Sequence, residues 1–547
     1  MAKIRFLMAC SMVFLLPPDL LADIGDRLLT IGPNGTPPGF GFSVDVYDGR
    51  FIVGSARPQL DQFHDTVDIY DSDTGEVIST LFSEDAELGF GRSVALGAER
   101  AIVGAVHLSS SNETGDDLGT AHIFDIQTGA EIMTLRPNDA RPGQGFGTSV
   151  AVAEDLNLAL VGASRDDELR FNGGAVYLFD LTTGEQLHKL TTPQEHANRG
   201  LWTLLGAEIA VDGNLAAFGE LNSEVPEGGT TRGSVQLFDL SSLQFLQKIT
   251  VPESPGRYHD LFGSGLDLDG SRLVVGAPGL EGNSGKAYVF DTTTGEPTMT
   301  LSPEVTQSYQ QFGSDIALQG DVVVVTSWNR SRSVSLFNAT SGEQLDRLTD
   351  RLEFEMRGAN DQVAIDDGLI VVGSPFDHSI HVIDGVLAGD FNHDGFIDVI
   401  DLDQLFAAIR GVNTDIRFDV DEDKEVTIDD ATFWIREIKN TFFGDANLDG
   451  RFDTKDFILV FQAGEFEDNI ALNSSWSTGD WNGDGEFNSR DFVVALQDTG
   501  FEAGPRVEQS VVPEPNCVWP LSMLLVSHYL RIRNKGLWRF NRQHPDS

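Results

Sequence analysis

The sequence is poor in cysteine, and this limits how the fold can be stabilised. Its 547 residues include two cysteines, Cys10 near the start and Cys517 near the end. The region between them therefore has no internal disulfide, although disulfides commonly support exported domains. Long apolar runs are also lacking, since the stretch from Phe6 to Leu16 is too short to span a bilayer. Stability must come from packed cores, for which a hydrophobic content of 40% suffices, and from metal binding.

Basic residues are scarce as well. Lysine and arginine number 37 against 85 aspartates and glutamates, which gives a formal net charge of −48. This excludes nucleic acid as a partner, because nucleic-acid binding needs clustered basic side chains. The chain also lacks a His-Glu-x-x-His motif, a Gly-x-Ser-x-Gly motif and a phosphate-binding glycine loop with its lysine. We therefore predict that the protein is not an enzyme, and an unrecognised active site remains an alternative.

The N-terminus predicts export. Lys3 and Arg5 precede the short apolar stretch, and Leu20-Leu21-Ala22 offers a cleavage point before Asp23. This order is typical of a secretory signal peptide, here over residues 1–22. We expect the protein to be extracellular or held at the cell surface.

A repeat of 45–59 residues runs through residues 23–388. Its seven copies are centred on Gly41, Gly91, Gly147, Gly206, Gly263, Gly313 and Gly358. Each complete copy contains four short runs of β-branched and aromatic residues, separated by turn residues such as Asp48-Gly49. Four strands per copy, repeated radially, predict a seven-bladed β-propeller, and a mainly β fold class. Glycines that end the second strand, such as Gly162, are expected where a side chain would crowd the neighbouring blade.

The ends of the repeat region predict how the ring closes. The seventh copy stops at Asp384 without its fourth strand, whereas residues 25–31 resemble the fourth strand of the other copies. We therefore expect the start of the mature chain to complete the last blade, which removes two exposed strand edges.

The repeats resemble the FG-GAP family, which forms the propellers of integrin α-subunits. The resemblance rests on Phe-Gly pairs such as Phe146-Gly147 and Phe262-Gly263, and on the Val-Gly-Ala segments Val161–Ala163 and Val275–Ala277. Several members of that family carry a calcium loop between the first two strands. This sequence has a short turn there, so we expect no calcium on the propeller. Trp202 and Trp328 are candidates for a sugar-binding rim, and packing between blades is the alternative.

Four acidic loops follow the propeller, and their spacing predicts calcium binding. Oxygen-bearing side chains recur at positions 1, 3, 5, 9 and 12, and position 7 supplies a backbone carbonyl, as calcium requires. The residues at positions 1, 3, 5, 7, 9 and 12 are Asp390, Asn392, Asp394, Phe396, Asp398 and Asp401 in the first loop; Asp419, Asp421, Asp423, Glu425, Thr427 and Asp430 in the second; Asp445, Asn447, Asp449, Arg451, Asp453 and Asp456 in the third; and Asp480, Asn482, Asp484, Glu486, Asn488 and Asp491 in the fourth. We predict up to four Ca²⁺ ions. The second loop should be the weakest site, because Lys424 stands at position 6, where a left-handed glycine is expected.

Apolar stripes predict a helix after each of three loops: Leu402, Leu405, Phe406 and Ile409; Phe457, Val460 and Phe461; Phe492, Val493 and Leu496. Position 8 is apolar in every loop, and we expect it to form a β-bridge between paired loops. Residues 389–503 thus resemble two dockerin-type modules of the EF-hand kind, 389–440 and 444–503. In that family, positions 10 and 11 help recognise a cohesin domain. Here they are Val399-Ile400, Ile428-Asp429, Thr454-Lys455 and Ser489-Arg490. Because these pairs differ, cohesin binding and a purely structural stalk both remain open.

The C-terminal residues 504–547 predict a sorting signal. Val512-Pro513-Glu514-Pro515 precedes an apolar run from Cys517 to Leu530 and a basic segment from Arg531 to Lys535. This order resembles the PEP-CTERM signal that an exosortase processes, so the tail would meet the membrane only transiently. An ordinary hydrophobic tail is the alternative. With its dockerin-like loops and the segment containing Trp476 and Trp481, interpreted as a linker, the chain is similar to exported proteins of planctomycete-type bacteria.

Taken together, these features predict an exported, calcium-binding scaffold protein. The propeller would recognise an extracellular protein or glycan, and the dockerin-like modules would form a calcium-folded stalk or docking device. A component of a polysaccharide-degrading assembly, attached through a cohesin, is the main alternative.

Overall fold

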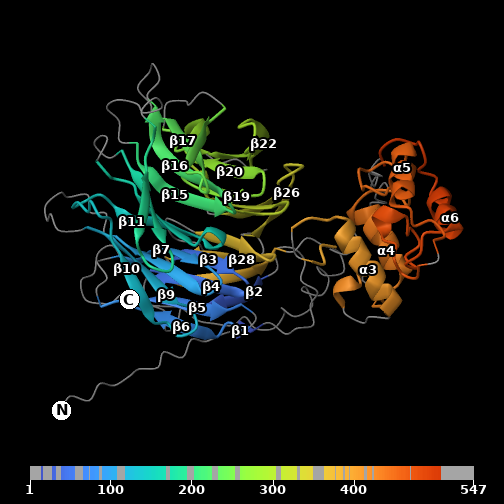
Figure 1. Ribbon diagram of the computed structural model, residues 1–547, viewed down its shortest axis with the longest axis horizontal. Coiled ribbons are helices and arrows are strands. Elements are labelled where there is room, and N and C mark those ends of the chain that lie inside the picture. Colours follow the sequence, from blue (N-terminus) through green and yellow to red (C-terminus); the bar gives the residue numbers. More distant parts are fainter. Residues whose placement is uncertain are drawn as a thin grey trace, which may run out of the picture.

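A computed structural model shows a β-rich body beside a smaller helical region (Figure 1). It describes residues 14–15, 27–32, 39–55, 66–72, 74–84, 89–106, 118–167, 173–193, 203–224, 232–252, 259–303, 309–328, 333–348, 362–375, 377–385, 389–392, 395–411, 416–421, 424–468 and 470–506. Most of the predicted sorting tail and most of the predicted signal peptide lie outside these residues. Among the described helices, none is long and apolar enough to cross a membrane.

The β-rich body is the predicted seven-bladed propeller, and every blade is an antiparallel sheet. Blade one contains β3 (Phe40–Tyr47), β4 (Arg50–Ser55), β5 (Val67–Asp71) and β6 (Val77–Leu81); blade two β7 (Phe90–Leu96), β8 (Arg100–Ala105), β9 (Thr120–Asp125) and β10 (Glu131–Leu135); blade three β11 (Phe146–Ala153), β12 (Leu158–Ala163), β13 (Ala175–Asp180) and β14 (Gln186–Leu190). Blade four contains β15 (Leu205–Asp212), β16 (Leu215–Glu224), β17 (Arg232–Asp239) and β18 (Gln244–Thr250); blade five β19 (Leu266–Asp269), β20 (Arg272–Ala277), β21 (Lys286–Asp291) and β22 (Pro297–Leu301); blade six β23 (Phe312–Gln319), β24 (Val322–Ser327), β25 (Val334–Asn338) and β26 (Gln344–Arg347). Short helical turns η1 (Glu154–Leu156) and α1 (Leu280–Asn283) lie in blades three and five.

The seventh blade closes the ring as predicted. It contains β27 (Val363–Asp366), β28 (Leu369–Ser374), β29 (Ser379–Asp384) and, as its fourth strand, β2 (Arg27–Ile31) from the other end of the chain. Leu29 pairs with Val382, and Thr30 pairs with His381. A two-residue strand, β1 (Phe14–Leu15), adds a fifth strand beside β2.

Glycine pairs hold neighbouring blades at close range. A Cβ atom on the glycine near the end of the second strand would overlap a carbonyl oxygen in the next blade, that of the Phe-Gly glycine or, in blade four, of Gly206 after Leu205. The pairs are Gly54 with Gly91, Gly104 with Gly147, Gly162 with Gly206, Gly219 with Gly263, Gly276 with Gly313 and Gly373 with Gly41. The expected crowding is thus confirmed, and it explains why glycine recurs at both positions.

The phenylalanine of each described Phe-Gly pair anchors its own blade. Phe40, Phe90, Phe146, Phe262 and Phe312 are all buried. Each ring meets an aromatic ring of the third strand edge-on; Phe312 and Phe337, for example, lie 5.6 Å apart at 74°. Edge-to-face pairs of this kind stabilise by about 0.5–1.5 kcal/mol beyond the area that they bury.

The helical region contains four helices and three short helical segments among the described residues. They are α3 (Val399–Gly411), η3 (Ile416–Phe418), α4 (Ile428–Phe433), η4 (Trp434–Ile438), α5 (Thr454–Ala463), η5 (Trp476–Thr478) and α6 (Ser489–Gln497). One hydrophobic core extends from Phe391 to Ala495 and so crosses the predicted boundary between residues 440 and 444. Trp476 and Trp481 are completely buried in it. Their interpretation as a linker was wrong: Trp476 Nε1 donates to the carbonyl of Asp445 at 2.6 Å.

The predicted apolar stripes were right for the first helix and partly wrong for the others. Leu402, Leu405 and Phe406 of α3 are buried. In α5 and α6, Phe461, Val493 and Leu496 are instead 53–54% exposed. Val460 is buried in the core as predicted, and Phe457 and Phe492 pack against it. The core also contains Ala495 of α6, which the predicted stripe left out.

The propeller has two unlike ends. Short turns join the first and second strands at one end, for example Asp48-Gly49 between β3 and β4. The longer connections, between the second and third strands and from blade to blade, join the strands at the opposite end. The helical region meets the short-turn end, where Asp321 in the turn between β23 and β24 donates its N–H to the carbonyl of Gly395 at 2.8 Å. The long-connection end therefore lies away from this contact.

Candidate metal centre

All four acidic loops share one pattern of backbone hydrogen bonds, organised by the aspartate at position 12. One of its carboxylate oxygens accepts from the N–H of position 2, and the other accepts from the N–H of position 9. In loop order, the distances are 2.7 and 2.9 Å to Asp401, 2.9 and 2.7 Å to Asp430, 3.0 and 2.8 Å to Asp456, and 2.9 and 2.9 Å to Asp491. All four carboxylates are buried. The sequence repeat is thus a repeat in three dimensions.

The aspartate at position 1 closes each loop through position 6. Asp390, Asp419, Asp445 and Asp480 each accept the N–H of position 6 at 2.8 Å. Position 6 has a positive φ throughout, which favours glycine. Lys424 adopts this conformation too, with φ +78°, as the sequence predicted. The cost of a left-handed lysine, roughly 1–2 kcal/mol, falls on the second loop alone.

Loop and helix share residues in at least three cases. Thr427, Asp453 and Asn488, all at position 9, cap the N-termini of α4, α5 and α6. In each of these helices the position-12 aspartate completes a capping box. A change that orders the loop therefore also orders the first turn of its helix.

Burial places these carboxylates under electrostatic stress. The pKa of Asp445 is raised to about 6 and that of Asp480 to about 7, chiefly by burial and in part by neighbouring carboxylates. The pKa values of Asp401, Asp430, Asp456 and Asp491 are also raised, again chiefly by burial. A bound cation would offset this cost of packing negative charge together.

The donor sets fit a divalent cation. Asp419, Asp421 and Asp430 bring one carboxylate oxygen each within 4.8 Å of one another. The other loops have Asn392, Asn447 and Asn482 at position 3, so an amide oxygen stands where this loop has a third carboxylate. In the fourth loop, Asp480 is 2% exposed, and its Oδ1 atom has no hydrogen-bond partner among the residues that the structure describes. Asp394 and Asp423, the predicted ligands at position 5, lie outside the described residues.

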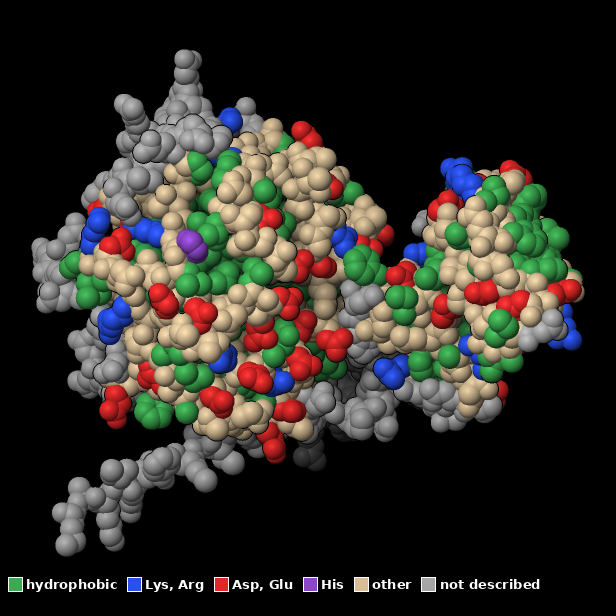
Figure 2. All heavy atoms as spheres, in the orientation of Figure 1, with side chains coloured by type: hydrophobic (Ala, Val, Ile, Leu, Met, Phe, Trp, Pro, Cys, Tyr) green, Lys and Arg blue, Asp and Glu red, His purple; other side chains and the backbone are tan. Residues whose placement is uncertain are grey.

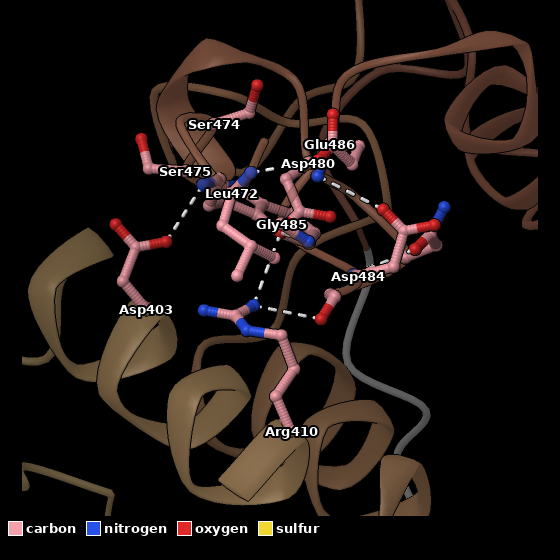
Figure 3. A network of polar contacts seen from close by, with 12 residues as sticks. Asp403, Arg410, Leu472, Ser474, Ser475, Asp480, Asp484, Gly485 and Glu486 are labelled. Carbon is pink, nitrogen blue, oxygen red and sulfur yellow. Dashed lines mark hydrogen bonds and ion pairs between the residues drawn. The ribbon is translucent and has the colours of Figure 1, made fainter. Parts of the chain in front are cut away.

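The fourth loop is also tied to the first helix (Figure 3). Arg410 of α3 donates to the carbonyl of Gly483 at 2.8 Å and lies 3.4 Å from Asp480 Oδ2. Asp403, on the same helix, accepts the backbone N–H of Trp476 at 2.8 Å. These contacts join the two predicted modules. They could not be predicted from the residue spacing within one loop.

The expected β-bridge between position-8 residues is wrong for the third and fourth loops. Phe452 pairs with Phe501, and the backbone of Phe487 bonds to Glu467 and Ser474. Both phenylalanine side chains enter the shared core instead. The residues at positions 10 and 11 lie at the helix starts, where Ile400 and Ile428 are 49% and 45% exposed.

An apolar surface covers the outer side of the helical region (Figure 2). It lies on α5 and α6, and its exposed members are Ile458, Leu459, Phe461, Val493 and Leu496. Exposed apolar patches of this kind are typical of contact surfaces.

The propeller's central channel contains acidic residues that sequence analysis missed. The innermost strands of the blades line a cavity of about 490 Å³. Its lining residues include Asp45, Glu208, Asp267 and Asp315. Burial raises the pKa of Glu208 to about 8 and that of each of the three aspartates to about 7. Comparing copies would have revealed them, since most other copies have serine or alanine at the matching positions.

The rim candidate Trp328 and the buried His122 have clear placements. Trp328 follows β24 at the long-connection end and is 41% exposed. This exposure fits a rim residue and not interblade packing. Trp202 lies outside the described residues. His122 is buried, with its ring nitrogens bonded to Thr120 and Glu131 at 2.8 Å, so it has a structural role.

Two segments of the propeller, residues 130–179 and 246–290, match the FG-GAP repeat family. Each matched segment begins with the outer strand of one blade and continues through three strands of the next. The sequence repeat is therefore offset from the blade by one strand, which is the offset that lets β2 complete blade seven. Together with the fold, this defines an FG-GAP repeat β-propeller with seven blades. A comparison with curated proteins found no match.

Proposed function

We propose that this protein is an exported, non-catalytic binding scaffold in which calcium folds the helical region into a stalk. The observation that carries the proposal is the hydrogen-bond pattern common to the four acidic loops. Such loops supply the oxygen ligands that calcium requires. The residues that would hold the ions are those at positions 1, 3, 5, 9 and 12, with the carbonyl of position 7.

The propeller would act as the recognition surface. The helical region contacts the short-turn end, so the long connections and Trp328 remain available at the other end. An exposed tryptophan suits stacking against a sugar or packing against a protein ligand. A glycan array and a protein-binding screen with the calcium-loaded chain would identify the ligand class, and Trp328→Ala should reduce binding if the ligand lies at this rim.

Calcium dependence provides the primary test. We expect the full chain to bind calcium and to lose helical circular dichroism when a chelator removes it, because the loop carboxylates repel one another without a cation. The propeller's β signal should persist in chelator. Absence of calcium binding in equilibrium dialysis would contradict the proposal.

Attachment to a polysaccharide-degrading assembly is the second candidate. The apolar surface on α5 and α6 favours it, because a stalk alone has no need of exposed Ile458 and Leu496. Capture by cohesin domains, lost in Leu496→Asp and retained in the matched propeller variant Leu246→Asp, would support this function. Leu246 offers a fair control because it is 49% exposed, close to the 54% of Leu496.

Export and processing complete the proposal. The sequence of residues 1–22 supports secretion, and that of residues 504–547 supports cleavage by an exosortase-type enzyme. Mass spectrometry of the protein recovered from its native cell surface would locate both ends of the mature chain.

A further inference from the structure

The first acidic loop differs from the other three because it touches the propeller. Gly395, at position 6, makes hydrogen bonds through both its backbone N–H and its carbonyl. Its N–H donates to Asp390 Oδ2 at 2.8 Å, and its carbonyl accepts the N–H of Asp321 at 2.8 Å. Asp390 is the position-1 residue of the loop, and Asp321 lies in the turn between β23 and β24 of blade six. One residue thus joins a predicted calcium ligand to the propeller.

The next two residues of the loop extend this contact. The guanidinium of Arg272 lies over the ring of Phe396, 5.1 Å from its centre. Arg272 Nη1 also bonds to Asp321 Oδ1 at 2.6 Å, which ties blade five to blade six beneath the loop. Ile397 packs against the hydrophobic cluster of blades six and seven. Positions 6, 7 and 8 of the loop therefore all contact the propeller.

The contact is tight enough to depend on loop shape. A Cβ atom on Gly395 would lie 2.6 Å from the carbonyl oxygen of Gln319 in blade six. Gly450 stands at the same position of the third loop with nearly the same φ, +82° against +79°, yet a Cβ there would meet nothing within 4 Å. The close fit thus belongs to the first loop and not to position 6 in general.

We propose that calcium in the first loop fastens the helical region to blade six and so sets the direction of the stalk relative to the propeller. The inference rests on the proposed calcium binding. The ion would hold Asp390 and the carbonyl of Phe396 in one geometry, and Gly395 between them carries the bond to Asp321. Because such coupling is reciprocal, the propeller contact in turn strengthens calcium binding at this loop.

Distance measurement on the full chain tests the proposal. Spin labels would be placed at Gln127→Cys in the propeller and Gln497→Cys in α6, both exposed positions, with the native cysteines replaced by serine. We expect one narrow distance distribution with calcium and a broad one with chelator. A distribution that stays narrow in chelator while calcium is shown to dissociate would overturn the inference and leave the proposed function intact.

Matched variants separate the first loop from the others. Asp390→Ala should broaden the distribution in calcium, whereas Asp445→Ala, at the same position of the third loop, should leave it narrow. Equal broadening by both would overturn the assignment to the first loop. Gly395→Ala and Gly450→Ala form a second pair with the same expected contrast, based on the clash with Gln319.

A fifth variant leaves the acidic loops unchanged, so it guards against misfolding of the first loop itself. Arg272→Ala removes the ring contact with Phe396 and the bond to Asp321. We expect the calcium concentration that narrows the distribution to rise about five-fold, the lower end of common coupling. An unchanged midpoint would refute the reciprocal coupling. If dialysis instead shows no bound calcium in the unsubstituted chain, the proposed function fails together with the inference.

Discussion

Replacement of Glu208 by glutamine should make the propeller more stable in alkaline solution. Glu208 faces the central channel, where its carboxyl has a pKa raised to about 8. Burial is the largest cause of this rise, Asp315 adds to it and Arg92 opposes it. A carboxyl with a raised pKa favours the folded state at low pH. Its stabilising effect is complete below the ordinary glutamate pKa and is lost as pH rises through about 8.

The magnitude follows from the size of this pKa change. Each pKa unit corresponds to about 1.36 kcal/mol, so the full rise sets an upper bound of about 5 kcal/mol. The channel is open to solvent, which screens the charge, and we therefore expect about 1–2 kcal/mol. Glu208→Gln should match the unsubstituted chain at pH 4 and exceed its unfolding free energy by this amount at pH 9.

Urea denaturation at the two pH values, with calcium held saturating, measures the difference through the β-sheet circular dichroism signal. Glu154→Gln, which removes a carboxylate at the short-turn mouth of the same channel, is the matched control. Parallel pH profiles for Glu208→Gln and the unsubstituted chain would refute the reasoning, because they would mean that Glu208 is charged at no cost in the folded channel.

Three further changes test the packing of each part of the molecule. Gly162→Ala should destabilise the propeller by about 2–3 kcal/mol, because the added methyl group overlaps the next blade. Gly213→Ala has open space around it but a φ of +52°, so it should cost about 1 kcal/mol. Urea denaturation compares the two variants, and equal losses of unfolding free energy would contradict the contact between blades. Trp476→Phe removes the bond to the Asp445 carbonyl and should lower the stability of the calcium-loaded helical region by about 1–3 kcal/mol in thermal denaturation; an unchanged transition would show that the bond contributes nothing. Arg410→Ala should separate α3 from the fourth loop at a cost of about 1–2 kcal/mol and leave the propeller transition unchanged; a shift of the propeller transition would argue against this local role.

Much of the fold was predictable because it depends on sequence patterns that span few residues. The Phe-Gly pairs and four strands per copy predicted seven blades, and residues 25–31 predicted the closing strand. Glycines such as Gly162 were correctly expected to face a neighbouring blade. The spacing of the acidic loops predicted their common geometry, including the left-handed Lys424. In each case the residues within one strand, one turn or one loop of twelve residues are sufficient to determine its local conformation.

The errors arose where residues distant in sequence meet. Trp476 and Trp481 looked like linker residues because no periodic pattern surrounds them, yet they fill the core that unites the helical region. The stripe predicted for α6 included Leu496, but the neighbouring helices leave that side of α6 exposed. A helical period identifies an apolar face, and only the packing partners decide how much of it is covered.

The sequence by itself determined the number of blades, the strand that closes the ring and the four acidic loops, since each depends on the order and spacing of nearby residues. Tertiary structure alone decided that carboxylates from four different blades share one channel. It also decided that the helical region has a single core and that the carbonyl of Gly395 accepts a hydrogen bond from Asp321. These features depend on the curvature of the ring and on docking between separate parts, which no local spacing encodes.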